Sequence, residues 1–206
     1  MRGFKVTIEE GERRYETLRD ILPGPHEKLT VLFIAKTPAL SSVAAGHYFQ
    51  GRQGQMFWKK LTDHEILKVA PGTFEDENLE VNKFGLTDIV KKPRSFGSEP
   101  SRAEYQEGAQ RILDLIKQHE PKVIVFVYKK VLDNLLKWNF GVKEKSVYGF
   151  NNKLTQKFNS KVFVFPMPAT PCTSELATIA MSELQRALPY MGNGVLRVKE
   201  KKDSPR

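Results

Sequence analysis

The chain has 206 residues, of which 33 are lysine or arginine and 24 are aspartate or glutamate, so its formal net charge is +9. With 40% hydrophobic and 28% charged residues it has the composition of a globular protein, which excludes a disordered chain, and its apolar runs are too short to span a membrane. One cysteine, Cys172, excludes an internal disulfide, and the first ten residues carry acids and no apolar segment typical of a secretion signal. We therefore expect a cytoplasmic protein, and its pI near 9.5 favours a polyanionic partner.

The first half of the chain contains two helix patterns and two strand patterns. The polar, amphipathic segment 7–22 predicts a helix that ends before the Pro-Gly-Pro sequence at 23–25. The apolar, β-branched run 29–35 predicts a buried strand of a parallel sheet, and a proline soon after it prevents further ladder pairing. A loop rich in Ser, Ala and Gly leads to a short predicted helix at 57–61, and 84–90 predicts a short strand.

The next helix is predicted from its first turn. Ser101 and Glu104 stand three residues apart and form a capping box, which satisfies the first backbone amides of a helix. The expected buried stripe of this helix comprises Ala109, Ile112, Leu113 and Ile116. Pro121 ends the helix, the apolar run 122–128 predicts another buried strand, and 131–138 predicts a further helix.

The last strand and helix complete the predicted domain. The strand covers 161–165, and Thr173 or Ser174 caps the helix that follows. The expected inner face of this helix comprises Leu176, Ile179, Ala180, Leu184 and Leu188. Residues 1–190 form a single predicted domain, and residues 191–206 a basic tail without periodicity.

This alternation of buried strands and amphipathic helices predicts an α/β three-layer sandwich. Its central, mainly parallel four-stranded sheet would be flanked by helices. Ligands of such sheets bind beyond the carboxyl ends of the strands. We therefore expect the functional residues within 36–49, 87–94 and 166–174.

Four stretches at these strand ends resemble the uracil-DNA glycosylase superfamily, in its mismatch-specific uracil/thymine-DNA glycosylase branch. They are Phe33-Ile34-Ala35-Lys36-Thr37-Pro38-Ala39-Leu40-Ser41-Ser42, then Ala45-Gly46-His47-Tyr48-Phe49 with Phe57-Trp58-Lys59, then Gly85-Leu86-Thr87-Asp88-Ile89-Val90-Lys91-Lys92-Pro93, and finally Val162-Phe163-Val164-Phe165-Pro166-Met167-Pro168-Ala169. The resemblance covers residues 29–188 and implies a monomer that flips and excises a deaminated or mismatched base from double-stranded DNA. The base would be uracil, hypoxanthine or thymine, released by hydrolysis of its N-glycosidic bond.

The chain departs from the family pattern at the catalytic positions. Thr37 stands where the branch has the asparagine that orients the attacking water, and Met167 stands where the second motif has asparagine, serine or histidine. Residues 169–173 replace a serine-rich loop, and Gln55 replaces an asparagine. One cysteine cannot hold an iron–sulfur cluster, and the sequence has no metal-binding cluster or nucleotide-binding loop, so we expect no cofactor.

Three residues are the catalytic candidates, each with a structural alternative. The Thr37 hydroxyl would hold the attacking water, or else would bond its own backbone in a turn. His47 would donate to the leaving base or contact a phosphate, or else would make a structural hydrogen bond. Asp88 would polarise water or stabilise positive charge on the sugar, although turn aspartates are common and favour a structural role.

The remaining candidates would bind the base or the DNA backbone. Phe49 aligns with the aromatic residue that stacks on the base in the family, and its neighbours in the site would be Ser42, Tyr48, Met167 and Ala169. The predicted DNA-binding residues are Lys36, Lys91, Lys92, Arg94, Thr170 and Thr173, with Lys129 and Lys130 as further phosphate contacts. Lys36 would alternatively form a Schiff base with the sugar and give a lyase step.

Two other function classes remain open from the sequence. Because Thr37 and Met167 replace the usual side chains, the chain could be a catalytically impaired DNA- or lesion-binding protein of the same fold. It could also be an α/β enzyme that acts on free nucleotides or other small ligands. Lesion binding without base release would indicate the first class, and binding of nucleosides but not DNA the second.

Overall fold

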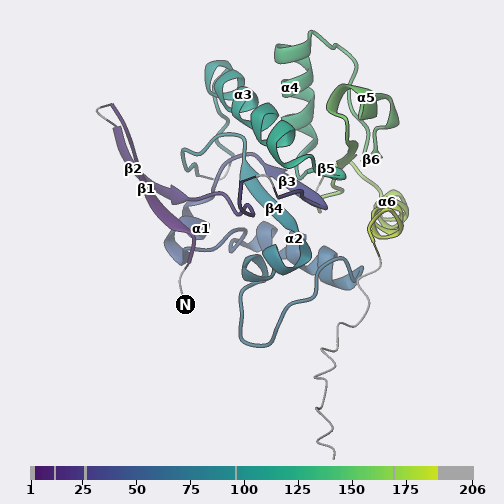
Figure 1. Ribbon diagram of the computed structural model, residues 1–206, viewed down its shortest axis with the longest axis horizontal. Helices are drawn as coiled ribbons and strands as arrows, with labels where there is room; N and C mark the ends of the chain where they lie inside the picture. The colour runs from purple at the N-terminus through teal and green to yellow at the C-terminus, as the bar shows by residue number, and fades with distance from the viewer. Residues whose placement is uncertain (1–2, 12, 26, 96, 169, 190–206) are drawn as a thin grey trace, which may run out of the picture.

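A five-stranded sheet lies between layers of helices in the computed structural model, which describes residues 3–11, 13–25, 27–95, 97–168 and 170–189 (Figure 1). The strand order is β4-β3-β5-β7-β6, with bounds β3 Val31–Ala35, β4 Phe84–Asp88, β5 Val123–Phe126, β6 Gly149–Phe150 and β7 Lys161–Val164. Strands β4, β3, β5 and β7 are parallel, whereas β6 is antiparallel to β7. The predicted α/β three-layer fold is confirmed, with one edge strand more than expected, because β6 has only two residues and leaves no pattern in the sequence.

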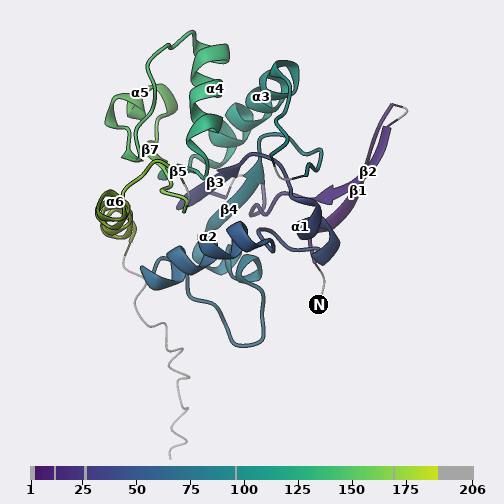
Figure 2. The same ribbon diagram turned by 180° about the vertical axis from the view of Figure 1, so that it is seen from behind.

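Helices cover both faces of this sheet. Helices α3 (Arg102–His119) and α4 (Lys129–Phe140) lie on one face, against strand residues such as Ile34 and Ile124. Helices α2 (Arg52–Asp63) and α6 (Ser174–Ala187) lie on the other, as Figure 2 shows. Because both faces are covered, each parallel strand is buried along most of its length and reads as a continuous apolar run. The shorter elements are α1 Leu40–Ala45, α5 Thr155–Phe158 and the 3-10 helices Glu75–Asn78, Glu80–Asn82 and Asn152–Leu154.

The N-terminal segment is a β-hairpin, so the helix predicted over 7–22 is wrong. Strands β1 (Lys5–Glu10) and β2 (Arg13–Leu18) pair antiparallel, with Ile8 opposite Tyr15. Gly11 has φ +59° in the connection, a left-handed conformation that glycine adopts readily. In β1 the apolar residues Val6 and Ile8 stand at alternate positions, which is the period of a strand and not that of a helix.

The helix caps agree with the sequence, whereas one predicted inner face does not. The Ser101 side chain accepts from the Glu104 amide, and the Glu104 carboxylate accepts from the Ser101 amide, which confirms the capping box. On α6, Leu176 and Ile179 are 55% and 48% exposed, so they do not belong to the buried face. The residues of α6 that are buried are Ala177, Ala180, Met181 and Leu184. The predicted tail lies outside the described residues.

Helix α3 packs closely against the end of β4. A Cβ atom at Gly108 would lie 1.8 Å from the carbonyl oxygen of Ile89, so only glycine allows this approach. No helix among the described residues combines the length and apolar character that crossing a bilayer requires.

Candidate active site

A cavity of about 820 Å³ opens at the carboxyl ends of the parallel strands. Thr37 after β3, Asp88 at the end of β4 and Tyr128 after β5 line it together. The first turn of α2 and Phe49 form further parts of its wall. The cavity therefore lies where ligands of parallel sheets bind, and its volume is in the range typical of small-molecule sites.

Thr37 and Asp88 stand at the ends of neighbouring strands. Ala35 is paired with Asp88 in the parallel register, and the Ile89 amide donates to the Ala35 carbonyl oxygen over 2.9 Å. The Val90 amide then donates to the Lys36 carbonyl oxygen over 3.1 Å, which continues the pairing past both strands. This pairing brings together two catalytic candidates that are 51 positions apart in the sequence.

The Asp88 carboxyl group is buried and incompletely paired. The residue is 1% exposed, and its Oδ2 atom has no hydrogen-bond partner among the described residues. Burial raises the pKa of Asp88 to about 7, the nearby Lys91 ammonium opposes this rise, and the Asp20 carboxylate adds to it. Asp88 can therefore gain or lose a proton near neutral pH while it lines the cavity.

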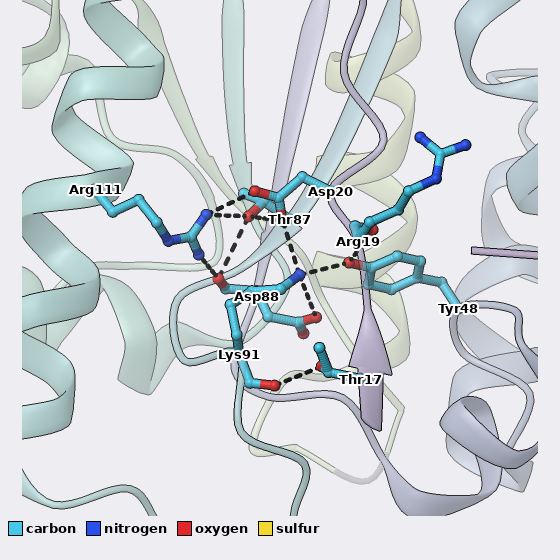
Figure 3. Close-up of polar contacts among 8 residues, drawn as sticks. All are labelled: Thr17, Arg19, Asp20, Tyr48, Thr87, Asp88, Lys91 and Arg111. Carbon is cyan, nitrogen blue, oxygen red and sulfur yellow. Dashed lines mark hydrogen bonds and ion pairs between the residues drawn. The ribbon is translucent and has the colours of Figure 1, made fainter. Parts of the chain in front are cut away.

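Polar residues from distant parts of the chain surround Asp88 (Figure 3). Asp20 accepts hydrogen bonds from Thr87 Oγ1 at 2.7 Å, Lys91 Nζ at 2.8 Å and Arg111 Nη1 at 2.7 Å. Arg111 also donates through Nη2 to the main-chain carbonyl oxygen of Asp88. Sequence reasoning missed both Asp20 and Arg111, because neither lies in a recognisable motif and only the fold brings them to this strand end.

Phe49 forms an aromatic wall of the cavity. Its ring packs on Phe57 and Trp58, with centroid separations of 4.5 and 5.6 Å. Phe49 has φ +58°, an uncommon conformation for a residue with a side chain. A Cβ atom at Gly54 would lie 2.3 Å from the Phe49 carbonyl oxygen, so this glycine allows the first turn of α2 to approach the Phe49 backbone. Local packing therefore fixes the position of Phe49 in the predicted stacking site.

Ser42 and Tyr48, which the sequence predicts to bind the base, also line the cavity. Ser42 Oγ accepts from the Gln50 amide over 3.1 Å, which closes the loop that carries Phe49. The Tyr48 hydroxyl donates to the Arg19 carbonyl oxygen and accepts from Lys91 Nζ, each over 3.1 Å. Burial raises the pKa of Tyr48 well above its ordinary value, so its hydroxyl stays protonated.

His47 lies behind the cavity wall and not among the described residues that line it. Its Nδ1 atom is 2.9 Å from Asp76 Oδ1, and its ring stacks on Phe74 with centroids 3.7 Å apart. The second oxygen of Asp76 accepts from the Tyr48 amide over 2.7 Å. This geometry favours the structural alternative, in which His47 and Asp76 fix the backbone next to Tyr48.

The residues predicted after β7 also lie apart from the described cavity lining. Met167 is 3% exposed and packs in the core, and Thr170 Oγ1 donates to its carbonyl oxygen over 2.5 Å. Thr173 is the N-cap of α6, where its side chain accepts from the Leu176 amide. Ala169 lies outside the described residues.

Several of the predicted DNA-binding side chains already have acidic partners. Lys36 and Arg94 line the cavity, where they pair with Glu99 at 2.9 Å and Glu104 at 2.5 Å respectively. The Lys91 side chain is 14% exposed and pairs with Asp20, so it is part of the interior network.

Two other cations are exposed, and one of them lies at the cavity rim. Lys92 is exposed, and Arg52 is exposed in the first turn of α2 on the cavity rim. Sequence reasoning missed Arg52, which has no local motif. Lys129 pairs with Asp133 at 2.9 Å, and Lys130 with Glu99 at 3.3 Å.

In the described part of the chain no three His, Cys, Asp or Glu side chains gather closely enough to hold a metal ion.

Comparison with known proteins identifies the family. Over 136 residues the chain is 26% identical to a G/U mismatch-specific uracil DNA glycosylase of Schizosaccharomyces pombe (strain 972 / ATCC 24843), a match that covers 65% of this chain and 42% of the relative. The chain thus spans less than half the length of that relative. Residues 23–180, most of the chain, match the model of the uracil DNA glycosylase superfamily, and the chain belongs to this superfamily.

Proposed function

We propose that the chain is a DNA glycosylase that excises a deaminated or mismatched base, such as uracil, hypoxanthine or thymine, from double-stranded DNA. Membership of the superfamily and the net charge of +9 support a DNA substrate. The observation that carries the proposal is the buried Asp88 carboxyl group, which has an oxygen without a hydrogen-bond partner in a cavity shared with Thr37 and Phe49. In a hydrolytic site such a group can act as a general base and accept the proton of the attacking water.

The cavity suits a single nucleotide rotated out of the duplex. An enzyme that acts on a base inside a duplex has to extrude it into a pocket and hold it by stacking and by polar contacts to its edge. Phe49 supplies the aromatic face, and Ser42 and Tyr48 supply polar groups in the same wall. Arg52 and Lys92 are exposed cations that would contact the DNA backbone.

Hydrolysis at this site would proceed by loss of the base and capture of the sugar by water. The bond between C1′ and the base nitrogen breaks, and its electron pair leaves with the base. The water oxygen bonds to C1′, and its proton passes to the Asp88 carboxylate while the Thr37 hydroxyl orients the water. Because Asp88 acts in its deprotonated form and its pKa is about 7, the rate is expected to rise as the pH increases through neutrality.

The first turn of α2 would stabilise the departing base. Residues 51–54 line the cavity, and this turn contains no acidic side chain. The amino-terminal end of a helix carries a partial positive charge, which favours a nearby anion. Such stabilisation acts on charge that develops in the transition state, so it accelerates the bond-breaking step.

A panel of end-labelled duplexes tests the proposal. Each duplex carries uracil, hypoxanthine or thymine opposite guanine, and alkali cleaves any abasic site after incubation with the protein. Strand breaks with the parent protein, reduced at least 100-fold by Asp88→Asn and not by substitution of the exposed Asp114 to Asn, are expected for the general base assigned here. Thr37→Ala with an unchanged rate would overturn the assignment of the water site.

The same assay separates the alternatives. Breaks before alkali treatment would show a lyase step and would point to Lys36, whose side chain lines the cavity beside Thr37. The replacement of the family's asparagine by Thr37 favours a second candidate, a lesion-binding protein without chemistry. A folded protein that binds the damaged duplexes and releases no base would establish this second function.

A further inference from the structure

Residues that precede the family-matched region build part of the Asp88 environment. The match begins at residue 23, yet Thr17, Arg19 and Asp20 contact the site (Figure 3). Thr17 Oγ1 donates to the Lys91 carbonyl oxygen over 2.6 Å, and the Arg19 carbonyl oxygen accepts from the Tyr48 hydroxyl. The hairpin and the residues that follow it are therefore connected to the site by direct hydrogen bonds.

Backbone pairing fixes the position of Asp20. Its neighbour Ile21 donates to the Leu86 carbonyl oxygen over 2.9 Å and accepts from the Leu86 amide over 2.8 Å, so this segment pairs with β4. The Arg19 amide donates to the Phe4 carbonyl oxygen over 2.8 Å on the other side. Asp20 is held between these two attachments, next to Thr87.

Asp20 forms ion pairs with Lys91 and Arg111, the two cations that act on Asp88. Lys91 Nζ is 2.8 Å from Asp20 Oδ1 and 3.9 Å from Asp88 Oδ2. Arg111 Nη1 is 2.7 Å from Asp20 Oδ2, while its Nη2 atom binds the main chain of Asp88 and not its carboxylate. The lysine is thus within 4 Å of both carboxylates and is bonded to Asp20.

We propose that Asp20 is a positioning residue that holds Lys91 and Arg111 away from the Asp88 carboxylate, so that one carboxylate oxygen of Asp88 remains available to the cavity. The catalytic consequence rests on the function proposed above, whereas the effect on Asp88 itself does not. The charged and titratable groups that act on Asp88 come from every neighbouring element and are Lys91, Asp20, Arg111, Tyr48 and Tyr128.

Removal of the Asp20 charge should lower the pKa of Asp88. The negative charge of Asp20 raises the pKa of Asp88, and Asp20→Asn removes it. The substitution also releases Lys91, which is then free to pair with Asp88. Both changes stabilise the Asp88 carboxylate, so Asp88 should lose its proton at lower pH, by about one pH unit for an opposite charge at this distance. Substitution of Lys91 to Met should act in the opposite direction, because it leaves the two carboxylates with fewer cations.

Carbon-13 NMR of the full chain labelled at aspartate carboxyls measures this directly. The Asp88 signal is assigned by its loss in Asp88→Asn and titrated in the parent, Asp20→Asn, Lys91→Met and Asp63→Asn. Asp63 is the matched control, because it also pairs with a lysine, Lys59 at 2.7 Å, but on the exposed surface of α2. We expect a lower Asp88 titration midpoint in Asp20→Asn, a higher one in Lys91→Met and no change in the control.

An unchanged or raised midpoint in folded Asp20→Asn would overturn the proposal. If that variant does not fold, Lys91→Met carries the test, and a midpoint that falls or stays constant would overturn it. The pH–rate profile on the damaged duplexes adds a second readout, in which the rising limb moves to lower pH in Asp20→Asn by the same shift. A merely structural Asp20 would lower the rate at every pH and leave this limb in place. If the parent releases no base, the proposed function fails while the NMR titration still decides the role of Asp20.

Discussion

The buried carboxyl group of Asp88 is expected to lower the stability of the fold at neutral and alkaline pH. Its pKa rises from 3.8 to about 7 on folding, mainly through burial. The folded protein therefore holds a proton that the unfolded chain releases, and stability is lost as the pH rises between these two values. A rise of about three pH units, at 1.36 kcal/mol for each, corresponds to about 4 kcal/mol of the free energy of unfolding above pH 7.

Substitution of Asp88 to Asn removes this pH dependence. Relative to the parent, the free energy of unfolding of Asp88→Asn should increase by about 2 kcal/mol between pH 5 and pH 7 and level off above about pH 8. Urea denaturation followed by circular dichroism at half-unit pH steps measures the difference, with the exposed Asp114→Asn as the control. Because the test concerns how the difference changes with pH, any constant effect of the asparagine cancels. Parallel stability curves for parent and Asp88→Asn over this range would refute the assignment of a neutral, buried carboxyl group.

Three further substitutions test the cavity wall and its rim. Phe49→Ala should slow single-turnover base release by about fivefold or more, because stacking on an aromatic side chain contributes ~1–3 kcal/mol per base; an unchanged rate would exclude Phe49 as the stacking residue. Gly54→Ala should lower the free energy of unfolding by about 1–3 kcal/mol in urea denaturation, because its methyl group would meet the Phe49 carbonyl oxygen. Equal stability would show that this approach is relaxed in solution. Arg52→Ala should lower the slope of log binding constant against log salt concentration by about 0.9 in fluorescence anisotropy with duplex DNA, as expected for one lost phosphate contact. Arg14→Ala on the hairpin is the control, and equal slopes for both variants would place Arg52 off the DNA.

Local patterns predicted the parallel sheet and its helices because their signals lie within a few residues. The run at 29–35 is apolar on both strand faces, which occurs where helices cover both sides of a sheet. Ser101 and Glu104 satisfy each other's amides over three residues, so their pattern fixes the start of α3. The sequence also predicts that Thr37, Asp88 and Phe49 lie near one another, because the strand ends of a parallel sheet meet at one edge. All three line the same cavity.

The features that the sequence did not predict depend on contacts between distant segments. The polar composition of the hairpin resembles that of an exposed helix, and the register that pairs Ile8 with Tyr15 leaves no local signal in the sequence. Asp20 is 91 positions from Arg111, and neither residue carries a local signal of the pairing. For Lys91, the basic character of its loop favoured an exposed DNA contact, whereas burial beside Asp20 makes it an internal cation.

The absence of a side chain at Gly108 sets the depth at which a guanidinium reaches the candidate active site. Arg111 lies three positions after Gly108, which places both on the same side of α3. The contact of Gly108 with the Ile89 carbonyl brings this side of the helix against the end of β4, and Arg111 then reaches the main chain of Asp88. Any larger residue at 108 would move the helix outward and withdraw the arginine with it. The distance between two backbones, and not only the choice of charged residues, thereby tunes the electrostatics of the cavity.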